Sequence, residues 1–248
     1  MTDIVSSERP LDGLIALVTG ATRGIGRAAA IGLAQAGAHV IAVGRTQGAL
    51  EALDDEILKL TGERATLVPL DVTKGDDIDQ LGGAIHQRWG KLDILVHAAG
   101  ILGELTPASH IEPKLWDRVI ATNLTSSYRL IRSLEPLLRL SKAGRAIFLT
   151  TGVATQPRAF WGVYAASKAG MESIVSCWAD EIEQTSIRTV LLQPGAMRTA
   201  MRAKAYPGEI PESLPHPSEI APLVVELTRP DRSPPARVEF RDWKAQRA

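Results

Sequence analysis

Short apolar runs rich in β-branched residues alternate with longer amphipathic stretches along nearly the whole chain. The apolar runs do not alternate between polar and apolar positions, which is typical of strands covered on both faces of a parallel sheet. Strands that alternate with helices at this spacing predict βαβ units with right-handed crossovers. Strands are expected at 14–19, 39–43, 65–70, 92–97, 146–151 and 187–193, and helices at 24–36, 46–60, 74–89, 114–140 and 163–185.

The fold class predicted from this pattern is α/β, with a doubly wound parallel sheet flanked by helices. No repeat or linker divides the 248 residues, so we expect a single domain over 1–248 with a flexible N-terminus at 1–10. The segment 200–217 holds four prolines and follows the end of a predicted strand, where open α/β sheets bind ligands. We expect it to form a lid over the substrate, and 237–241 to form a short last strand.

Composition excludes several classes of function. The 28 basic residues balance the 28 acidic ones, which argues against a nucleic-acid partner. A single cysteine, Cys177, fits a reducing compartment, and we expect it to be buried. The first residues lack the apolar core of a signal peptide, and no run approaches the ~20 apolar residues that cross a bilayer. These features predict a cytoplasmic protein that binds no membrane, and the five histidines form no cluster typical of a metal site.

A glycine-rich turn joins the first predicted strand to the first predicted helix, with the sequence TGATRGIG over 19–26. Glycines at such a turn let the backbone approach a pyrophosphate, while the helix N-terminus offers free N–H groups and a positive dipole end. As an alternative, glycines in a turn often only allow the chain to change direction and bind no ligand. Because this turn lies between strand one and helix one of a βαβ unit, we favour dinucleotide binding.

The end of the second predicted strand indicates which dinucleotide binds. NAD-preferring proteins usually carry an acidic residue there, which binds the ribose 2′-hydroxyl. This chain instead has Gly44, Arg45 and Thr46, and a second arginine, Arg23, lies in the glycine turn. A guanidinium can hold a 2′-phosphate through two parallel hydrogen bonds. The alternative is that both arginines are solvated surface charges, but their two positions favour NADP(H).

Six motifs along the chain resemble those of the short-chain dehydrogenase/reductase family over about residues 11–230. They are TGATRGIG at 19–26, Asp71-Val72, HAAG at 97–100, Asn123, YAASK at 164–168 and PGAMRT at 194–199. The resemblance implies a Rossmann-type sheet and an NADP(H)-dependent oxidoreductase. With the two arginines, the implied cofactor contacts are Gly20, Thr22, Arg23, Gly24, Ile25, Gly26, Arg45, Thr46, Asp71, Val72, Ala98, Ala99, Gly100, Lys168, Pro194, Gly195, Met197 and Thr199.

Tyr164 and Lys168 lie four residues apart, so on a helix they share one face. A phenol has a pKa near ~10, too high for an efficient base at neutral pH, and a neighbouring ammonium is expected to lower it. Tyr164 would then donate a proton to a carbonyl that receives hydride, or accept one from an alcohol in the reverse direction. The resemblance gives Lys168 a second contact, with the nicotinamide ribose, and makes Asn123 the holder of a water that relays protons.

The family's catalytic serine corresponds to Thr151, thirteen residues before Tyr164. A threonine hydroxyl can donate the same hydrogen bond to a substrate carbonyl, although its methyl group crowds the site. An alignment shifted by one residue would place Gly152 there and leave no hydroxyl. His97 replaces the first asparagine of the family's NNAG motif and is expected to be a packed histidine at a strand end.

The expected substrate is a small neutral or hydrophobic carbonyl or secondary alcohol. The segments expected to wall its pocket supply mostly apolar side chains: Leu102, Leu105, Phe160, Trp161, Met201 and Tyr206. Charges on Arg198, Arg202 or Lys204 of the lid could change that preference. The resemblance also implies a homodimer or homotetramer. A non-catalytic NADP(H)-binding redox sensor, and an epimerase or dehydratase on the same scaffold, remain as alternatives.

Overall fold

The computed structural model describes residues 9–247, and within them the chain forms a seven-stranded, wholly parallel sheet with the strand order β3-β2-β1-β4-β5-β6-β7. The strands are β1 (Ile15–Thr19), β2 (His39–Gly44), β3 (Thr66–Pro69), β4 (Ile94–His97), β5 (Arg145–Leu149), β6 (Arg188–Gln193) and β7 (Arg237–Glu239). The predicted doubly wound α/β fold is confirmed. The expected flexible segment 1–10 lies almost entirely outside the described residues.

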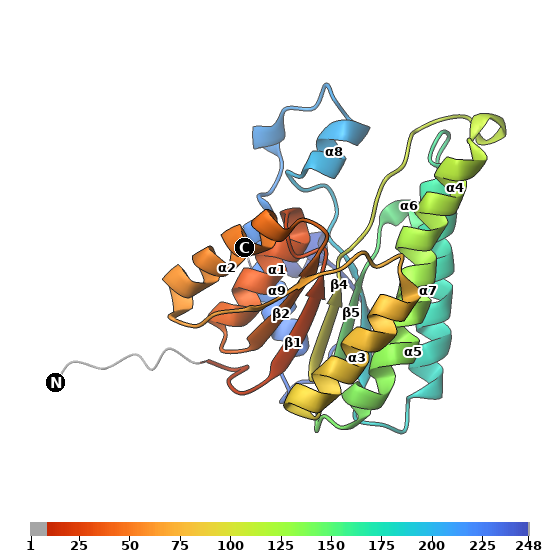
Figure 1. Ribbon diagram of the computed structural model, residues 1–248. Helices are drawn as coiled ribbons and strands as arrows, with labels where there is room; N and C mark the ends of the chain where they lie inside the picture. Colours follow the sequence, from red (N-terminus) through yellow and green to blue (C-terminus); the bar gives the residue numbers. More distant parts are fainter. Residues whose placement is uncertain (1–8, 248) are drawn as a thin grey trace.

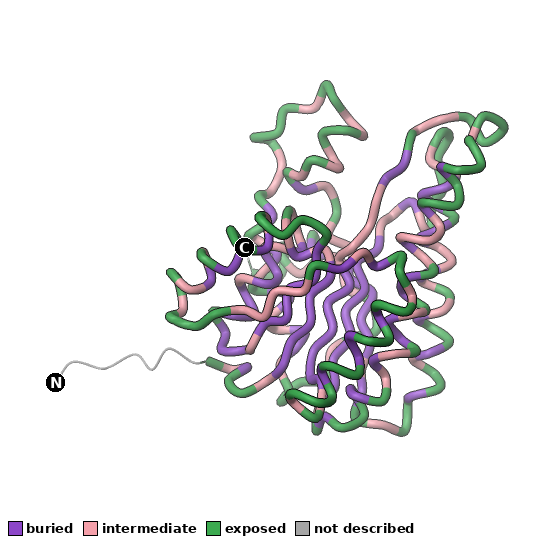
Figure 2. The backbone as a smooth tube through the Cα atoms, viewed as in Figure 1, coloured by how far each residue is buried: buried purple, intermediate pink, exposed green. Residues whose placement is uncertain are grey.

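Helices cover both faces of the sheet (Figure 1). On one face lie α1 (Gly24–Gln35), α2 (Gln47–Thr61) and α9 (Ala221–Thr228), whose apolar residues share a core with β1 and β2. The other face carries α3 (Gly75–Trp89), α5 (Ser126–Arg139) and α7 (Gly162–Glu181), which form a second core. Both cores meet the fully buried central strands seen in Figure 2, as expected for strands without alternating polarity.

Shorter elements complete the fold. They are α4 (Pro113–Ile120), α6 (Gly152–Thr155), α8 (Ala200–Ala205), α10 (Phe240–Ala245), a π-helical turn η2 (Ala121–Thr125), and the 3₁₀ turns η1 (Ala108–His110), η3 (Pro211–Ser213) and η4 (Pro217–Ile220). In residues 9–247 no helix combines the length and apolarity needed to span a bilayer.

The strand order creates a switch point between β1 and β4. From β1 the chain moves outward through β2 to β3, then crosses back to pair β4 on the other side of β1. Loops that leave β1 and β4 therefore diverge at the carboxyl ends of these strands, and this is where open α/β sheets bind ligands. The glycine turn and the HAAG segment both lie at that edge.

Three predictions of local structure are wrong. The expected single helix at 114–140 is divided into α4 and α5 by the π-helical turn η2. Two helices near the C-terminus, α9 and α10, were not expected, and the last strand is shortened to 237–239 because α10 begins directly after it. Cys177 is exposed on α7, where it follows the solvent side of the helix, rather than buried.

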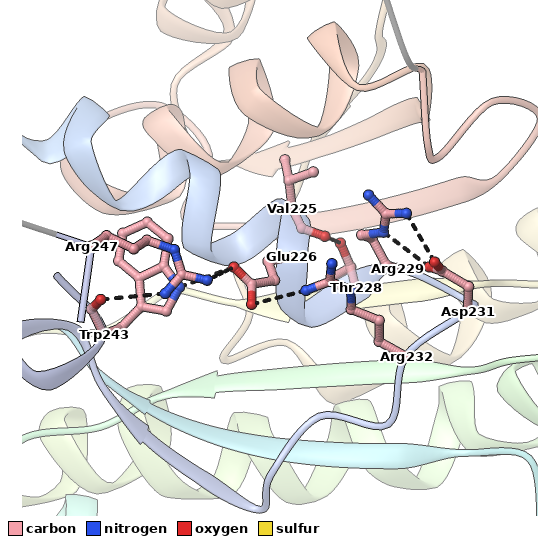
Figure 3. A network of polar contacts seen from close by, with 8 residues as sticks. All are labelled: Val225, Glu226, Thr228, Arg229, Asp231, Arg232, Trp243 and Arg247. Carbon is pink, nitrogen blue, oxygen red and sulfur yellow. Dashed lines mark hydrogen bonds and ion pairs between the residues drawn. The ribbon is translucent and has the colours of Figure 1, made fainter.

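The C-terminal helix is fixed to α9 by a polar network around Glu226 (Figure 3). The Glu226 carboxylate accepts hydrogen bonds from Arg232 at 3.3 Å, the Trp243 indole N–H at 3.0 Å and Arg247 at 2.7 Å. The neighbouring turn is held from below by the buried Arg145 of β5, which donates to the backbone carbonyl of Arg232 at 2.7 Å. These contacts keep the end of the chain, including β7, against the sheet.

Candidate active site

The glycine turn packs directly against the HAAG segment. Gly20 has a φ of +66°, and a Cβ atom there would lie 2.7 Å from the Ala99 nitrogen. A Cβ on Gly26 would lie 2.2 Å from the Gly20 oxygen, so neither position can carry a side chain without moving backbone. The backbone N–H of Ala98 donates to the Thr19 carbonyl at 3.2 Å. The fold thus brings together two motifs that lie about eighty residues apart in sequence.

A third motif, PGAMRT at 194–199, lies next to the glycine turn. Gly195 has a φ of +71°, and Met197 is buried in the core on the α1 side. Thr199 begins α8 and lies beside the start of α1, since a Cβ on Gly24 would be 3.4 Å from its Cγ2 atom. Pro194 is half-buried, and Ile25 packs against the core beneath the turn.

Arg23 and Arg45 both lie exposed at this edge of the sheet, and neither forms a side-chain hydrogen bond or ion pair with another residue in the range 9–247. Gly44 lies against Thr22, so a Cβ on Gly44 would approach the Thr22 Cγ2 atom to 2.6 Å. An acidic side chain at position 44 would therefore be crowded as well as repulsive to a phosphate. Thr46 is exposed at the start of α2.

The pair Asp71-Val72 follows β3 on the same side. Val72 is buried, and the Asp71 carboxylate accepts hydrogen bonds from the backbone N–H and the hydroxyl of Thr73 at 3.0 and 2.9 Å. Burial acts to raise the pKa of Asp71, but these hydrogen bonds and the positive charges of Arg45 and Lys74 lower it overall. The carboxylate is therefore ionised and close enough to Arg45 to sense its charge.

Tyr164 and Lys168 lie on one face of α7, as predicted, with exposed fractions of 8% and 5%. The Lys168 ammonium donates a hydrogen bond to the Leu149 carbonyl at 2.8 Å. The Tyr164 hydroxyl instead faces the Met201 sulfur at 3.9 Å. The two groups expected to interact thus each have another partner.

The expected effect on the tyrosine is corrected by this geometry. Burial raises the pKa of Tyr164 to about 12, opposite to the lowering expected from the neighbouring lysine. Burial also lowers the pKa of Lys168 to about 8, and the charge of Glu172 opposes that change. In this state the Tyr164 phenol is protonated at neutral pH, and the Lys168 ammonium loses its proton at a pH only slightly above neutral.

Asn123 is fully buried in the π-helical turn η2, with its side chain directed at the HAAG loop. Its Oδ1 atom accepts from the Ile101 N–H at 2.8 Å, and its Nδ2 atom donates to the Ile101 carbonyl at 2.9 Å and to Ser167 at 3.0 Å. A Cβ on Gly100 would lie 3.5 Å from Asn123 Oδ1 and 3.7 Å from Lys168 Nζ. The missing side chain of Gly100 leaves space between these two groups.

Thr151 lies at the end of β5 and begins the short helix α6. Its Oγ1 atom accepts a hydrogen bond from the Val153 N–H at 3.5 Å, which leaves the hydroxyl proton available for a second partner. Gly152, the alternative position, lies beside Gln193 within the turn of α6. Of the two alternatives, Thr151 carries a hydroxyl and Gly152 does not, so Thr151 stays our candidate for the carbonyl donor.

His97 is packed at the end of β4 inside a chain of hydrogen bonds. Ser126 donates to the Thr122 carbonyl at 2.6 Å, so its oxygen accepts from His97 Nε2 at 3.2 Å. His97 Nδ1 then accepts from the Thr19 hydroxyl at 2.7 Å. Burial, together with the charge of Lys168, lowers the pKa of His97 to about 3. The imidazole is therefore neutral and joins the glycine turn to η2.

The segment 200–217, expected to form a lid, lies beyond the carboxyl ends of the strands (Figure 1). Lys204 of α8 donates to the Gly103 carbonyl at 2.7 Å, and Met201 packs with Leu102, Val153 and Tyr164. Arg202 is held by Glu209 at 2.6 Å. Of the three cations that could change the substrate preference, Arg202 and Lys204 are therefore already bound to groups of the protein itself.

The aromatic residues of the predicted pocket divide into two groups. Trp161 lies between Tyr164 and Tyr206, with ring centroids 5.9 Å from each. Phe160 is instead 56% exposed and has a φ of +72°, and its carbonyl accepts from the Thr106 N–H. The apolar wall is thus formed by Trp161, Met201 and Tyr206 without Phe160. Among residues 9–247 no group of three or more His, Cys, Asp or Glu side chains could hold a metal ion.

Comparison with known proteins identifies the family. The model of the short-chain dehydrogenases matches residues 14–210. The chain belongs to this family. It is 39% identical to the oxidoreductase YciK of Escherichia coli K12, over 89% of this chain and 88% of that protein. Identity to the 3-oxoacyl-[acyl-carrier-protein] reductase FabG of Vibrio harveyi is 33%, over 89% and 92% of the two chains.

The solved structures that resemble the chain include a short-chain dehydrogenase from Escherichia coli CFT073 complexed with NADPH. It is 38% identical, has a TM-score of 0.90, and is matched over 94% of this chain and 98% of that one. The chain is therefore an oxidoreductase of the short-chain dehydrogenase type, which acts on CH–OH or C=O groups, as the motifs predicted.

Proposed function

We propose that this short-chain dehydrogenase is an NADP(H)-dependent carbonyl reductase for small, neutral or hydrophobic substrates. The observation that carries the proposal is the buried pair Tyr164 and Lys168, which lies beside Gly100 at the edge of the sheet that also holds the glycine turn. The NADPH complex of the E. coli CFT073 relative and the reductase name of FabG support it.

The residues present fit a dinucleotide. Gly20 and Gly26 keep the turn free of side chains, and the space left by Gly100 lies beside Lys168 and Asn123. Arg23 and Arg45, whose side chains form no hydrogen bond or ion pair within 9–247, would hold the 2′-phosphate, with Thr22 and Thr46 beside them. The remaining predicted contacts would be made from the same end of the sheet, with Val72 and Met197 buried beneath it: Gly24, Ile25, Asp71, Val72, Ala98, Ala99, Pro194, Gly195, Met197 and Thr199.

The bound nicotinamide would supply the hydride for reduction of a carbonyl and accept it in the reverse direction. Tyr164 would donate its proton to the developing alkoxide. A phenol whose pKa is about 12 is protonated at neutral pH, which suits the reducing direction. Thr151 would donate a hydrogen bond to the same oxygen and so stabilise its charge. Lys168 would favour the phenolate left behind, and Asn123 would hold the loop at Ile101.

The substrate class follows from the side chains around the Tyr164 hydroxyl. Trp161, Met201 and Leu102 are apolar, while the lid cations Arg202 and Lys204 are held by Glu209 and Gly103. A charged substrate would have to compete with these contacts, so a neutral or hydrophobic carbonyl is favoured. We also propose a homodimer or homotetramer, since Trp116 of α4 and Tyr128 of α5 expose large aromatic surfaces.

A panel of aldehydes and ketones tests the proposal. We expect stoichiometric oxidation of NADPH with apolar ketones and aldehydes, and slower turnover with NADH. Tight NADPH binding without turnover across the panel would instead support the redox sensor, and release of unreduced product with no net oxidation of NADPH would support the epimerase or dehydratase.

A further inference from the structure

Glu172 lies one helical turn beyond Lys168 on α7, with its side chain only 12% exposed. No motif of the family includes it. Arg237 of β7 donates two hydrogen bonds to its carboxylate, one to each oxygen, both at 2.9 Å. A paired geometry of this kind fixes the carboxylate in one orientation.

A third contact connects Glu172 to the catalytic segment. The hydroxyl of Thr150 donates a short hydrogen bond to its Oε1 atom. Thr150 lies between Leu149, whose carbonyl accepts from Lys168, and Thr151, the candidate carbonyl donor. One carboxylate therefore holds the backbone at the end of β5 and also lies next to the lysine.

The titratable groups around Lys168 and Glu172 lie on three elements of the fold. Tyr164 and Glu172 lie on the same helix as Lys168, His97 faces this lysine from the end of β4, and Arg237 faces Glu172 from β7. Burial lowers the pKa of Lys168, and the negative charge of Glu172 acts against this change. His97 and Tyr164 are neutral near pH 7, since their pKa values are about 3 and about 12. The ionised neighbour that favours the ammonium is thus Glu172.

We propose that Glu172, held in place by Arg237 of the C-terminal strand, is a positioning residue that keeps Lys168 charged and orients the Leu149–Thr151 segment. The last strand thereby contributes to the active site although it supplies no residue that touches a substrate. Its catalytic consequence rests on the proposed function, whereas the electrostatic link between Glu172 and Lys168 does not.

The titration of Lys168 tests the link directly in the chain without added cofactor. The ¹³Cε resonance of Lys168, assigned by its absence in Lys168→Met, is followed from pH 6 to pH 11. Glu172→Gln retains an acceptor for Thr150 but removes the charge, so we expect the Lys168 midpoint to fall by about half a pH unit or more. Glu239→Gln, which removes a carboxylate near Arg237 but off α7, should leave the midpoint unchanged.

A second variant separates charge from loosened structure. Arg237→Gln leaves the Glu172 charge in place and removes a nearby cation, so the Lys168 midpoint should rise or stay constant. The proposal is overturned if Glu172→Gln leaves the Lys168 titration unchanged, or if Arg237→Gln lowers it as much as Glu172→Gln does. In the turnover assay, Glu172→Gln should move the pH profile of kcat in the same direction as the Lys168 midpoint. A shifted Lys168 titration in a protein that oxidises no NADPH would refute the proposed function but support the link.

Discussion

The ammonium of Lys168 donates a hydrogen bond to the carbonyl oxygen of Leu149, 2.8 Å away, and not to the hydroxyl of Tyr164. This contact fixes the lysine to the end of β5, directly beside Thr150 and Thr151. The hydroxyl of Tyr164 is left facing Met201 of the lid. The phenol therefore has the Met201 side chain as its neighbour, and burial rather than the charge of the lysine determines its pKa in this state.

Arg45 is expected to contribute to the choice of NADP(H). Replacing it with glutamine removes a guanidinium that could form two hydrogen bonds to a 2′-phosphate, so the Kd for NADPH should rise by about tenfold or more, equivalent to about 1.4 kcal/mol. Affinity for NADH, which lacks the phosphate, should not change. Isothermal titration calorimetry at one fixed salt concentration measures both constants.

The matched control is Arg139→Gln, an exposed arginine at the end of α5, at the opposite edge of the sheet. It should leave both affinities as they are. Equal binding of the two cofactors by the unmodified protein would contradict the assignment, and so would an equal loss of both in Arg45→Gln.

Thr151 is expected to stabilise the oxygen of the reacting carbonyl. Thr151→Ala removes the hydroxyl and should lower kcat by about a hundredfold, whereas Thr151→Ser keeps a donor and should retain most of the turnover. Since Thr151 also caps the first turn of α6, the alanine variant should lose about 1 kcal/mol of unfolding free energy or less. Thermal unfolding separates this effect from the catalytic one. Unchanged kcat in both variants would remove Thr151 from the mechanism.

Lys204 is expected to hold the segment 200–206 against the loop that follows β4, through its hydrogen bond to Gly103. In Lys204→Gln the shorter side chain loses this contact, so amide hydrogen exchange in 200–206 should become faster and KM for the carbonyl substrate should rise. Lys59→Gln, at the exposed end of α2, is the control. Identical exchange in the lid of both variants would show that another contact closes it.

His97 is expected to make the fold sensitive to acid. Its pKa is about 3 in the fold against 6.5 when unperturbed, so the unfolded chain binds more protons between these values. Stability due to a neutral His97 is therefore complete above pH 6.5 and declines as the pH falls, by at most about 1.4 kcal/mol per pH unit. Urea unfolding at pH 5 and pH 7.5 should show a smaller difference in His97→Asn than in the unmodified chain.

The exposed His86 on α3 supplies the comparison for that measurement. His86→Asn should show the same loss of stability between pH 7.5 and pH 5 as the unmodified chain. If His97→Asn loses as much stability between pH 7.5 and pH 5 as the unmodified chain, the imidazole of His97 does not remain neutral in the fold.

Much of the fold was predictable because it depends on local chemistry. Gly62 and Gly90, which follow α2 and α3, both adopt the left-handed conformation in which helices commonly end. The glycine turn also required its glycines for steric reasons that the motif indicates. These positions are determined by residues within a few places of one another.

The remaining features depend on contacts between distant parts of the chain. The π-helical turn at Asn123 arises where the asparagine reaches the backbone of Ile101, and no periodicity in 114–140 indicates it. The raised pKa of Tyr164 results from its burial among residues distant in sequence, such as Leu102 and Met201, which the spacing to Lys168 cannot reveal. Glu172 was missed for the same reason, since its partner Arg237 lies on the last strand.

The central claim is that Tyr164 supplies the proton for carbonyl reduction. The most direct test compares Tyr164→Phe with the unmodified chain for NADPH binding and for NADPH oxidation with an active ketone. Because phenylalanine preserves the ring but removes the hydroxyl, we predict an unchanged Kd for NADPH and a loss of kcat of about a hundredfold or more. Turnover by Tyr164→Phe at the rate of the unmodified chain would contradict the account.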